Sequence, residues 1–87
     1  MNAQYFIEKF SAIPEEQWCV LQLTDEQGRH CVYGHCGSDY MPEGNALGKI
    51  LDFQTSFIND GEHSQYQQPT PKQRILAALE DARKEGK

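Results

Sequence analysis

Residues 70–86 read TPKQRILAALEDARKEG, and this stretch carries the strongest helix signal in the chain. Thr70 is a typical N-cap residue, Pro71 suits the first helical position, and Gln73 completes a capping box. The apolar residues recur at the spacing of one helix face: Ile75, Leu76, Leu79 and Ala82. Gly86 is a suitable stop signal. The stretch therefore predicts an amphipathic helix that buries one face in the core.

The N-terminal segment also has the pattern of a helix. Its apolar residues follow the spacing of one helix face: Ala3, Phe6, Ile7 and Phe10. Asn2 is a suitable N-cap. We expect the helix to end before Pro14, because proline removes a backbone donor and disfavours helix at the residue before it.

A third helix is predicted over residues 45–54, with Asn45 as its cap and Gly48 as a weak point. The sequence Asn59-Asp60-Gly61 then predicts a tight turn. Phe57 and Ile58, just before this turn, are expected to be buried. The polar residues 62–69 are expected to be extended.

The segment between the first two helices, residues 18–36, has the pattern of a β-hairpin. Residues 19–24 alternate in side-chain direction, DEQG at 25–28 is a turn signal, and RHCVY at 29–33 contains β-tolerant residues. The alternative is a helix that starts near Cys31. Gly34 and Gly37 argue against that helix, since each costs about 1 kcal/mol in a helix interior. The predicted fold class is α+β, with three helices and a short hairpin in one domain over residues 1–87.

Composition limits the partners that we expect. The chain has 87 residues and a net charge of −5, and it lacks the clustered basic residues that nucleic-acid binding requires. Residues 70–87 hold five basic and three acidic residues, so the net charge of this segment is +2 and that of residues 1–69 is −7. No apolar run approaches the ~20 residues needed to cross a membrane. With no secretory signal and an odd number of cysteines, three, a cytoplasmic protein with reduced thiols is predicted.

Several short motifs resemble those of a known group of proteins. In chain order they are Trp18-Cys19, Cys31-x-x-Gly34, Leu47 with Ile50-Leu51, Ile58-Asn59-Asp60 and a final amphipathic helix. This order resembles a family of small uncharacterised bacterial and phage proteins that contain a domain of unknown function. The resemblance implies a compact, helix-rich domain and no established activity. The family pattern continues after the glycine with a helix, so the resemblance implies that residues 31–34 lead into a helix. The chain departs from this pattern at residues 35–37, where it has His35, Cys36 and Gly37.

The stretch HCVYGHC, residues 30–36, raises the question of a metal site. Together with Cys19 it offers five ligands of the type that zinc prefers: Cys19, His30, Cys31, His35 and Cys36. The spacing is poor for a zinc site, because adjacent His30 and Cys31 point to opposite faces of a strand. Cys31, His35 and Cys36 remain the candidate ligands. The simpler interpretation is that the cysteines pack as small apolar residues, with Cys31 in the core, and no cofactor is expected.

A thiol hydrolase is a second possibility. Such an enzyme needs a thiolate, a histidine base and a residue that orients the imidazole. The candidates are Cys19 or Cys31 as nucleophile, His35 or His63 as base, and Asn59 or Asp60 as orienting residue. No local signature fixes these roles. For Asn59 and Asp60 the favoured interpretation is structural, a turn or helix end in which their side chains satisfy nearby backbone donors.

The aromatic residues suggest an interaction protein. Trp18 is expected in the core, although tryptophan also anchors binding partners. Tyr33, Tyr40 and Tyr66 are candidates for an interaction surface. The sequence therefore favours a non-enzymatic interaction or accessory protein of bacterial or phage origin, with an unknown protein partner and oligomeric state. The alternative is a Cys/His site with zinc or thiol chemistry.

Overall fold

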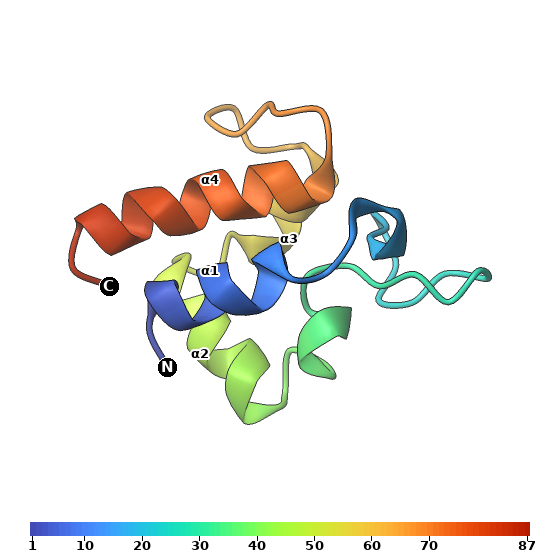
Figure 1. Cartoon of the computed structure of the whole chain (residues 1–87), viewed down its shortest axis with the longest axis horizontal. Coiled ribbons are helices and arrows are strands. Elements are labelled where there is room, and N and C mark those ends of the chain that lie inside the picture. The colour runs from blue at the N-terminus through green and yellow to red at the C-terminus, as the bar shows by residue number, and fades with distance from the viewer.

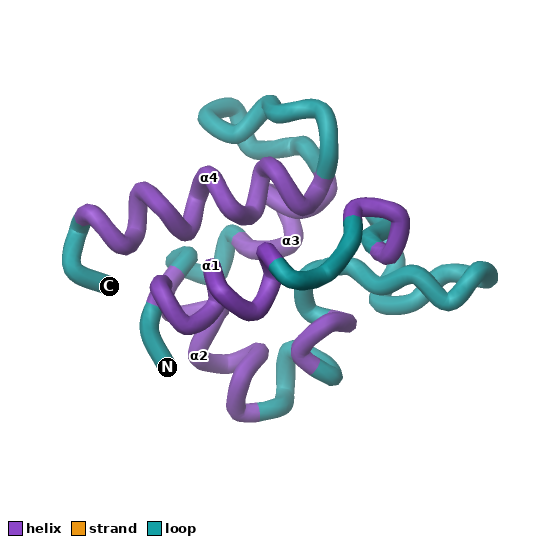
Figure 2. Tube along the Cα trace, viewed as in Figure 1, coloured by secondary structure: helices purple, strands orange, loops and turns teal.

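The computed structural model describes all 87 residues and contains four α-helices and no β-strand. The helices are α1 (Ala3–Ser11), α2 (Pro42–Ile50), α3 (Thr55–Asp60) and α4 (Pro71–Lys84), with 3₁₀ turns η1 (Glu15–Gln17) and η2 (Gly34–Cys36). Figures 1 and 2 show these helices joined by loops, with nothing drawn as strand. The predicted α+β class is therefore wrong, and the protein is all-α.

The first and last helices form the main layer. α1 and α4 lie side by side and run in opposite directions (Figure 1). At one end Lys72 Nζ donates to the carbonyl of Ser11 at 3.1 Å, and at the other the amide of Ala3 donates to the carbonyl of Lys87 at 3.1 Å. The two termini of the chain are therefore adjacent.

The core lies between α1, α4 and the shorter helices. Five large apolar side chains have no solvent exposure: Phe6, Phe10, Leu47, Ile75 and Leu79. Burying each of them contributes about 1.5–3 kcal/mol relative to exposure. The core continues through Trp18, whose ring centroid lies 5.5 Å from that of Phe10. The prediction that Trp18 is a core residue is confirmed by its exposed fraction of 4%.

The predictions for α1 and α4 are confirmed. Asn2 Oδ1 accepts from the amide of Tyr5 at 2.9 Å, and Thr70 Oγ1 accepts from the amide of Gln73 at 3.2 Å, so both N-caps form as expected. α1 ends at Ser11, before Pro14. Of the residues expected to be buried in α4, only Leu76 remains partly exposed.

The middle of the chain differs from the prediction. α2 begins at Pro42, a residue that favours the first turn, so Asn45 lies inside the helix and does not cap it. The expected tight turn at residues 59–61 is the end of α3, where Gly61 adopts a left-handed φ of 81°. Ile58 is buried as predicted, but Phe57 is 55% exposed because it lies on the solvent side of α3.

The predicted hairpin is an arm, residues 19–31, that projects from the helical body on the right of Figure 1. The chain does reverse at the expected turn, where the amide of Gly28 donates to the carbonyl of Asp25 at 3.1 Å. However, only two isolated bridges form, and one of them, between Trp18 and His30, is parallel. No ladder of the kind that a hairpin requires is present.

Some backbone groups of the arm pair within it, such as the amide of Cys31 with the carbonyl of Leu23 at 3.2 Å, and others pair with the body. Leu21 adopts a φ of 67°, which interrupts the extended run. Its amide donates to Asp60 Oδ1 at 3.0 Å, and the amide of Val32 donates to Asn59 Oδ1 at 3.0 Å. In a hairpin these backbone amides would donate to carbonyls of a neighbouring strand. Here side chains of α3 accept from them instead. The alternative prediction, a helical start near Cys31, comes closer, since η2 follows at residues 34–36.

No helix in the chain has both the length and the apolar content needed to cross a lipid bilayer.

Candidate functional site

The two histidines of HCVYGHC lie together against the core. The ring centroid of His35 is 4.6 Å from that of Trp18 and 5.3 Å from that of His30. His30 Nδ1 is 2.8 Å from Thr24 Oγ1, which fixes the ring of His30 at the base of the arm. The close approach depends on Gly34, because a Cβ there would collide with the carbonyl oxygen of Leu23.

His35 is an uncharged packing residue in this arrangement. Burial and the nearby His30 and Lys9 lower the pKa of His35 to about 4. Its Nε2 atom is buried and has no hydrogen-bond partner. A neutral imidazole packed at an angle against Trp18 therefore stabilises the base of the arm.

The three cysteines are free and occupy different surroundings. Cys36 is buried, and burial raises the pKa of its thiol to about 11. Cys19 is also buried; its Sγ donates to the carbonyls of Gln22 and Arg29 at 3.4 Å each, and burial raises its pKa. Cys31, which we expected in the core, is partly exposed.

The structure forms no metal site from the predicted ligands and does not pair Cys19 with a histidine. No group of three or more His, Cys, Asp or Glu side chains has a geometry that can hold a metal ion. The thiol of Cys19 donates to backbone carbonyls and not to a histidine. A nucleophilic thiol needs a lowered pKa, whereas the pKa values of Cys19 and Cys36 are raised. His63 lines a different cavity from every cysteine.

Asn59 and Asp60 join the arm to the body. Asn59 is 1% exposed, and its Nδ2 donates to the carbonyl of Cys19 and to Asp60 Oδ1, each at 3.0 Å. With the bonds from Val32 and Leu21, the two side chains of α3 make contacts to both sides of the arm. Their role is to position the arm, which agrees with the structural interpretation made from the sequence.

Arg74 supports the same region from the other side. Its guanidinium is buried and donates to the carbonyls of Ile58, Asn59 and Gln68 at 3.1, 2.7 and 2.9 Å. Two of these carbonyls lie at the C-terminal end of α3, where a cation interacts favourably with the helix dipole. Arg74 thus fixes the last turn of α3, which carries Asn59 and Asp60.

A cleft of about 250 Å³ lies where the arm meets α3, and we call it the arm cleft. Its lining consists of Leu21, Gln22, Leu23, Cys31, Tyr33, Asp39, Ser56, Asn59 and Asp60. The arm contributes the two leucines, and α3 contributes the polar floor. The buried bonds of Asn59 therefore hold one wall of the cleft against the other.

Apolar side chains around this cleft are unusually exposed. Leu21 is 73% exposed and Leu23 is 46% exposed. Leu21 also has a left-handed φ of 67°, a conformation that costs a residue with a branched side chain about 1–2 kcal/mol. Nearby, Phe53 has a φ of 59° and is 66% exposed. The protein thus holds large apolar groups in solvent in unfavourable backbone conformations.

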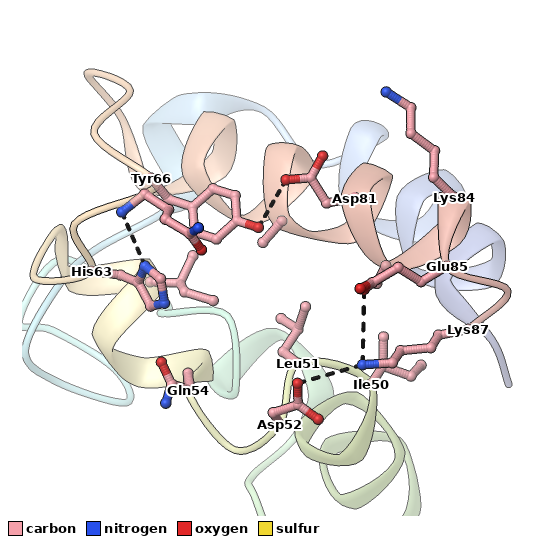
Figure 3. A pocket seen from close by; sticks show the side chains of 14 residues that line it. Ile50, Leu51, Asp52, Gln54, His63, Tyr66, Asp81, Lys84, Glu85 and Lys87 are labelled. Atoms are coloured by element: carbon pink, nitrogen blue, oxygen red, sulfur yellow. Dashed lines mark hydrogen bonds and ion pairs between the residues drawn. The ribbon is translucent and has the colours of Figure 1, made fainter.

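A second hollow, a groove of about 600 Å³, lies beside the C-terminal half of α4 (Figure 3). Tyr66 donates from its hydroxyl to Asp81 Oδ2 at 2.9 Å, and burial together with this bond raises the pKa of Tyr66 to about 12. Lys87 Nζ lies 3.4 Å from Asp52 Oδ2 and 4.0 Å from Glu85 Oε2. Several polar and charged side chains on the rim of this groove are therefore already bound to one another.

The three tyrosines proposed as an interaction surface do not line a common cavity. Tyr33 lines the arm cleft and Tyr66 lines the groove of Figure 3. Tyr40 is 90% exposed and lines neither of them.

Sequence reasoning missed Arg74 and the two exposed leucines. A signal for Arg74 was present, because Arg74, Ala78 and Ala82 are spaced by four residues and therefore share the buried face of α4. The strand pattern places Leu21 and Leu23 on the same side as Cys19 and does not indicate that they are exposed. Their exposure follows from the left-handed turn at Leu21, which no local sequence signal indicates.

Comparison with protein-family models, with curated proteins and with solved structures finds no match for this chain. The resemblance to small bacterial and phage proteins stays a prediction from sequence.

Proposed function

We propose that this protein is a non-enzymatic interaction domain that binds another protein through the arm cleft. The observation that carries the proposal is the exposure of Leu21, which is 73% in solvent while its backbone holds a φ of 67°. Exposed apolar patches on small domains often mark interaction sites, and strained residues gather at ligand-binding positions.

The architecture around Leu21 supports this function. The arm has no sheet to stabilise it, yet two side chains of α3 hold it in one position. The side chain of Asn59 is buried where it binds the arm. Arg74 donates to the carbonyl of Asn59 and so fixes the end of α3. A preorganised surface loses less conformational entropy when a partner binds. We therefore assign the network of Asn59, Asp60 and Arg74 to the support of a binding surface.

The setting of this function is also a proposal. We propose an accessory protein of bacterial or phage origin that acts in the cytoplasm. The sequence resemblance supports the origin, and an odd number of cysteines supports a reducing compartment.

A selection of short random peptides displayed on a surface tests the proposal. Peptides that bind the wild-type protein are then measured against the double variant Leu21→Ser/Leu23→Ser. Phe57→Ser is a matched control, because Phe57 is also an exposed apolar residue, at 55%, but does not line the cleft.

We expect recovered peptides to bind the double variant about tenfold more weakly, since two apolar contacts are lost. Phe57→Ser should bind them with nearly unchanged affinity. If no peptide depends on Leu21 and Leu23, or if Phe57→Ser has the same effect, the arm cleft is not the binding surface.

A further inference from the structure

The charged groups in the arm cleft have one sign. Only two of the lining residues carry charge, Asp39 and Asp60, and both are acidic. Neither forms an ion pair with a basic side chain of the protein. Asp60 uses Oδ1 to accept from the amide of Leu21 and from Asn59 Nδ2. Asp39 is exposed. The cleft therefore presents two carboxylates whose charge no side chain of the protein pairs.

The chain segment that supplies most of the lining is also acidic, although Glu43 within it is paired with Lys9 at 2.9 Å. Between Phe10 and Gly48 the chain has six acidic residues and a single Lys or Arg, Arg29. Arg29 forms an ion pair with Asp25, in which Nε lies 2.6 Å from Oδ2. Arg74 lies behind Asp60, but its guanidinium is buried and bound to three backbone carbonyls. The charged side chains that line the cleft are therefore both negative, and Arg74 offsets part of the charge of Asp60 from behind the lining.

The other walls suit the rest of a basic side chain. Tyr33 provides an aromatic ring, on which a guanidinium can stack. Leu21 and Leu23 offer apolar surface to the methylene stem of the side chain and to an apolar neighbour. Arginine combines a planar fork for carboxylates with a face for aromatic stacking, which lysine lacks.

From this charge complementarity we infer that the arm cleft binds a protein segment that inserts an arginine between Asp39 and Asp60, beside an apolar residue that packs on Leu21 and Leu23. The inference rests on the proposed function, since it names the chemistry of the partner for the same surface.

The peptide selection described above also tests the charge of the partner. Peptides whose binding depends on Leu21 and Leu23 are sequenced and resynthesised with each arginine replaced by citrulline, which keeps the shape of the side chain and removes its charge. Binding is measured to the wild-type protein and to Asp39→Asn and Asp60→Asn. Asp60→Asn keeps an oxygen for the amide of Leu21, so the arm should stay in place. Glu16→Gln is the matched control, because Glu16 is exposed and lines no cavity.

We expect cleft-dependent peptides to contain arginine next to an apolar residue, and citrulline to weaken them about fivefold or more. Asp39→Asn and Asp60→Asn should each weaken the arginine peptide and leave the citrulline peptide unchanged. Asp39→Asn should also keep the unfolding temperature, because Asp39 is exposed and lies outside the network that holds the arm. Glu16→Gln should change neither peptide. Cleft-dependent peptides that are neutral or acidic would overturn the arginine inference and leave the interaction function standing. Failure to recover any cleft-dependent peptide would overturn both.

Discussion

Asn59 Nδ2 donates to the carbonyl of Cys19 over 3.0 Å, and this bond joins α3 to an arm that lies 40 residues earlier in the chain. The same side chain accepts from the amide of Val32 at 3.0 Å, so one buried amide holds both sides of the arm. Because the arm has no β-ladder, these bonds and those of Asp60 position Leu21 and Leu23 together with bonds inside the arm, such as the one from the amide of Cys31 to the carbonyl of Leu23 at 3.2 Å. The binding surface that we propose is therefore built by side chains of a helix.

Replacing Asn59 with alanine should destabilise the protein and release the arm. The variant leaves the buried amide of Val32 and the carbonyl of Cys19 without partners, which costs about 2–4 kcal/mol in the free energy of unfolding. Urea denaturation measures this change. Asn45→Ala is the control, because Asn45 is an exposed residue in α2 whose side chain makes no hydrogen bond within the protein. Equal stability of the two variants would show that Asn59 does not hold the arm.

Arg74 should be sensitive even to a conservative change. Arg74→Met removes three donors from the carbonyls of Ile58, Asn59 and Gln68 and should cost about 3 kcal/mol. Arg74→Lys should also destabilise, because an ammonium group lacks the planar fork that reaches several acceptors. Thermal unfolding checks both variants against Arg83→Met, which changes an exposed arginine on the same helix. Little effect of Arg74→Met would contradict the role of this network.

Leu21→Asn should stabilise the protein while it weakens binding. Asparagine tolerates the left-handed conformation better than leucine, so relief at a φ of 67° should raise the free energy of unfolding by about 0.5–1 kcal/mol. The same change removes exposed apolar surface from the arm cleft. Chemical denaturation and peptide affinity, measured on one sample, should therefore move in opposite directions. A destabilised variant would mean that Leu21 packs within the arm and is not kept for a partner.

Acid should destabilise the protein through His35. Its pKa is about 4 in the folded protein and near 6.5 when unfolded, so between these values the unfolded chain binds the extra proton. The free energy of unfolding should consequently fall as pH decreases from about 6.5 to about 4. Because the ring is half-buried, solvent screening weakens this dependence on pH. We expect the free energy of unfolding to fall by about 1–2 kcal/mol over this range.

His35→Phe separates this effect from the titration of other groups. Phenylalanine keeps a ring against Trp18 and replaces a buried Nε2 that has no partner. Urea denaturation across this pH range should show a flatter pH dependence in the variant than in the wild type. Parallel curves would show that His35 is not the group responsible.

The two long helices were predictable because their signals are local. Thr70 and Gln73 lie three residues apart, and the buried side chains of α4 follow the helical period, so no distant contact is needed to assign them. The same holds for Asn2 and α1. Such signals identified the layer on which the core is built.

The arm was not predictable, because residues far apart in sequence determine it. Alternation over residues 19–24 indicates a strand only if a neighbouring strand accepts its hydrogen bonds. Here the amide of Leu21 donates to Asp60 and the carbonyl of Cys19 accepts from Asn59 instead, and a short pattern cannot reveal contacts across about 40 residues. The sequence did single out Asn59 and Asp60, as a turn or a site, but it gave no indication that Leu21 and Leu23 are exposed. The candidate site was therefore recognised in part, through Tyr33, Cys31, Asn59 and Asp60.

Hydrogen exchange at the amide of Val32 tests most directly whether side chains of α3 build the binding surface. In the wild-type protein this amide donates to Asn59 Oδ1 and should be well protected. In Asn59→Ala we expect it to exchange at nearly the rate of an unfolded chain, under conditions where the amide of Leu79 in α4 stays protected. A Val32 amide that is unprotected in the wild type, or equally protected in both proteins, would contradict the account.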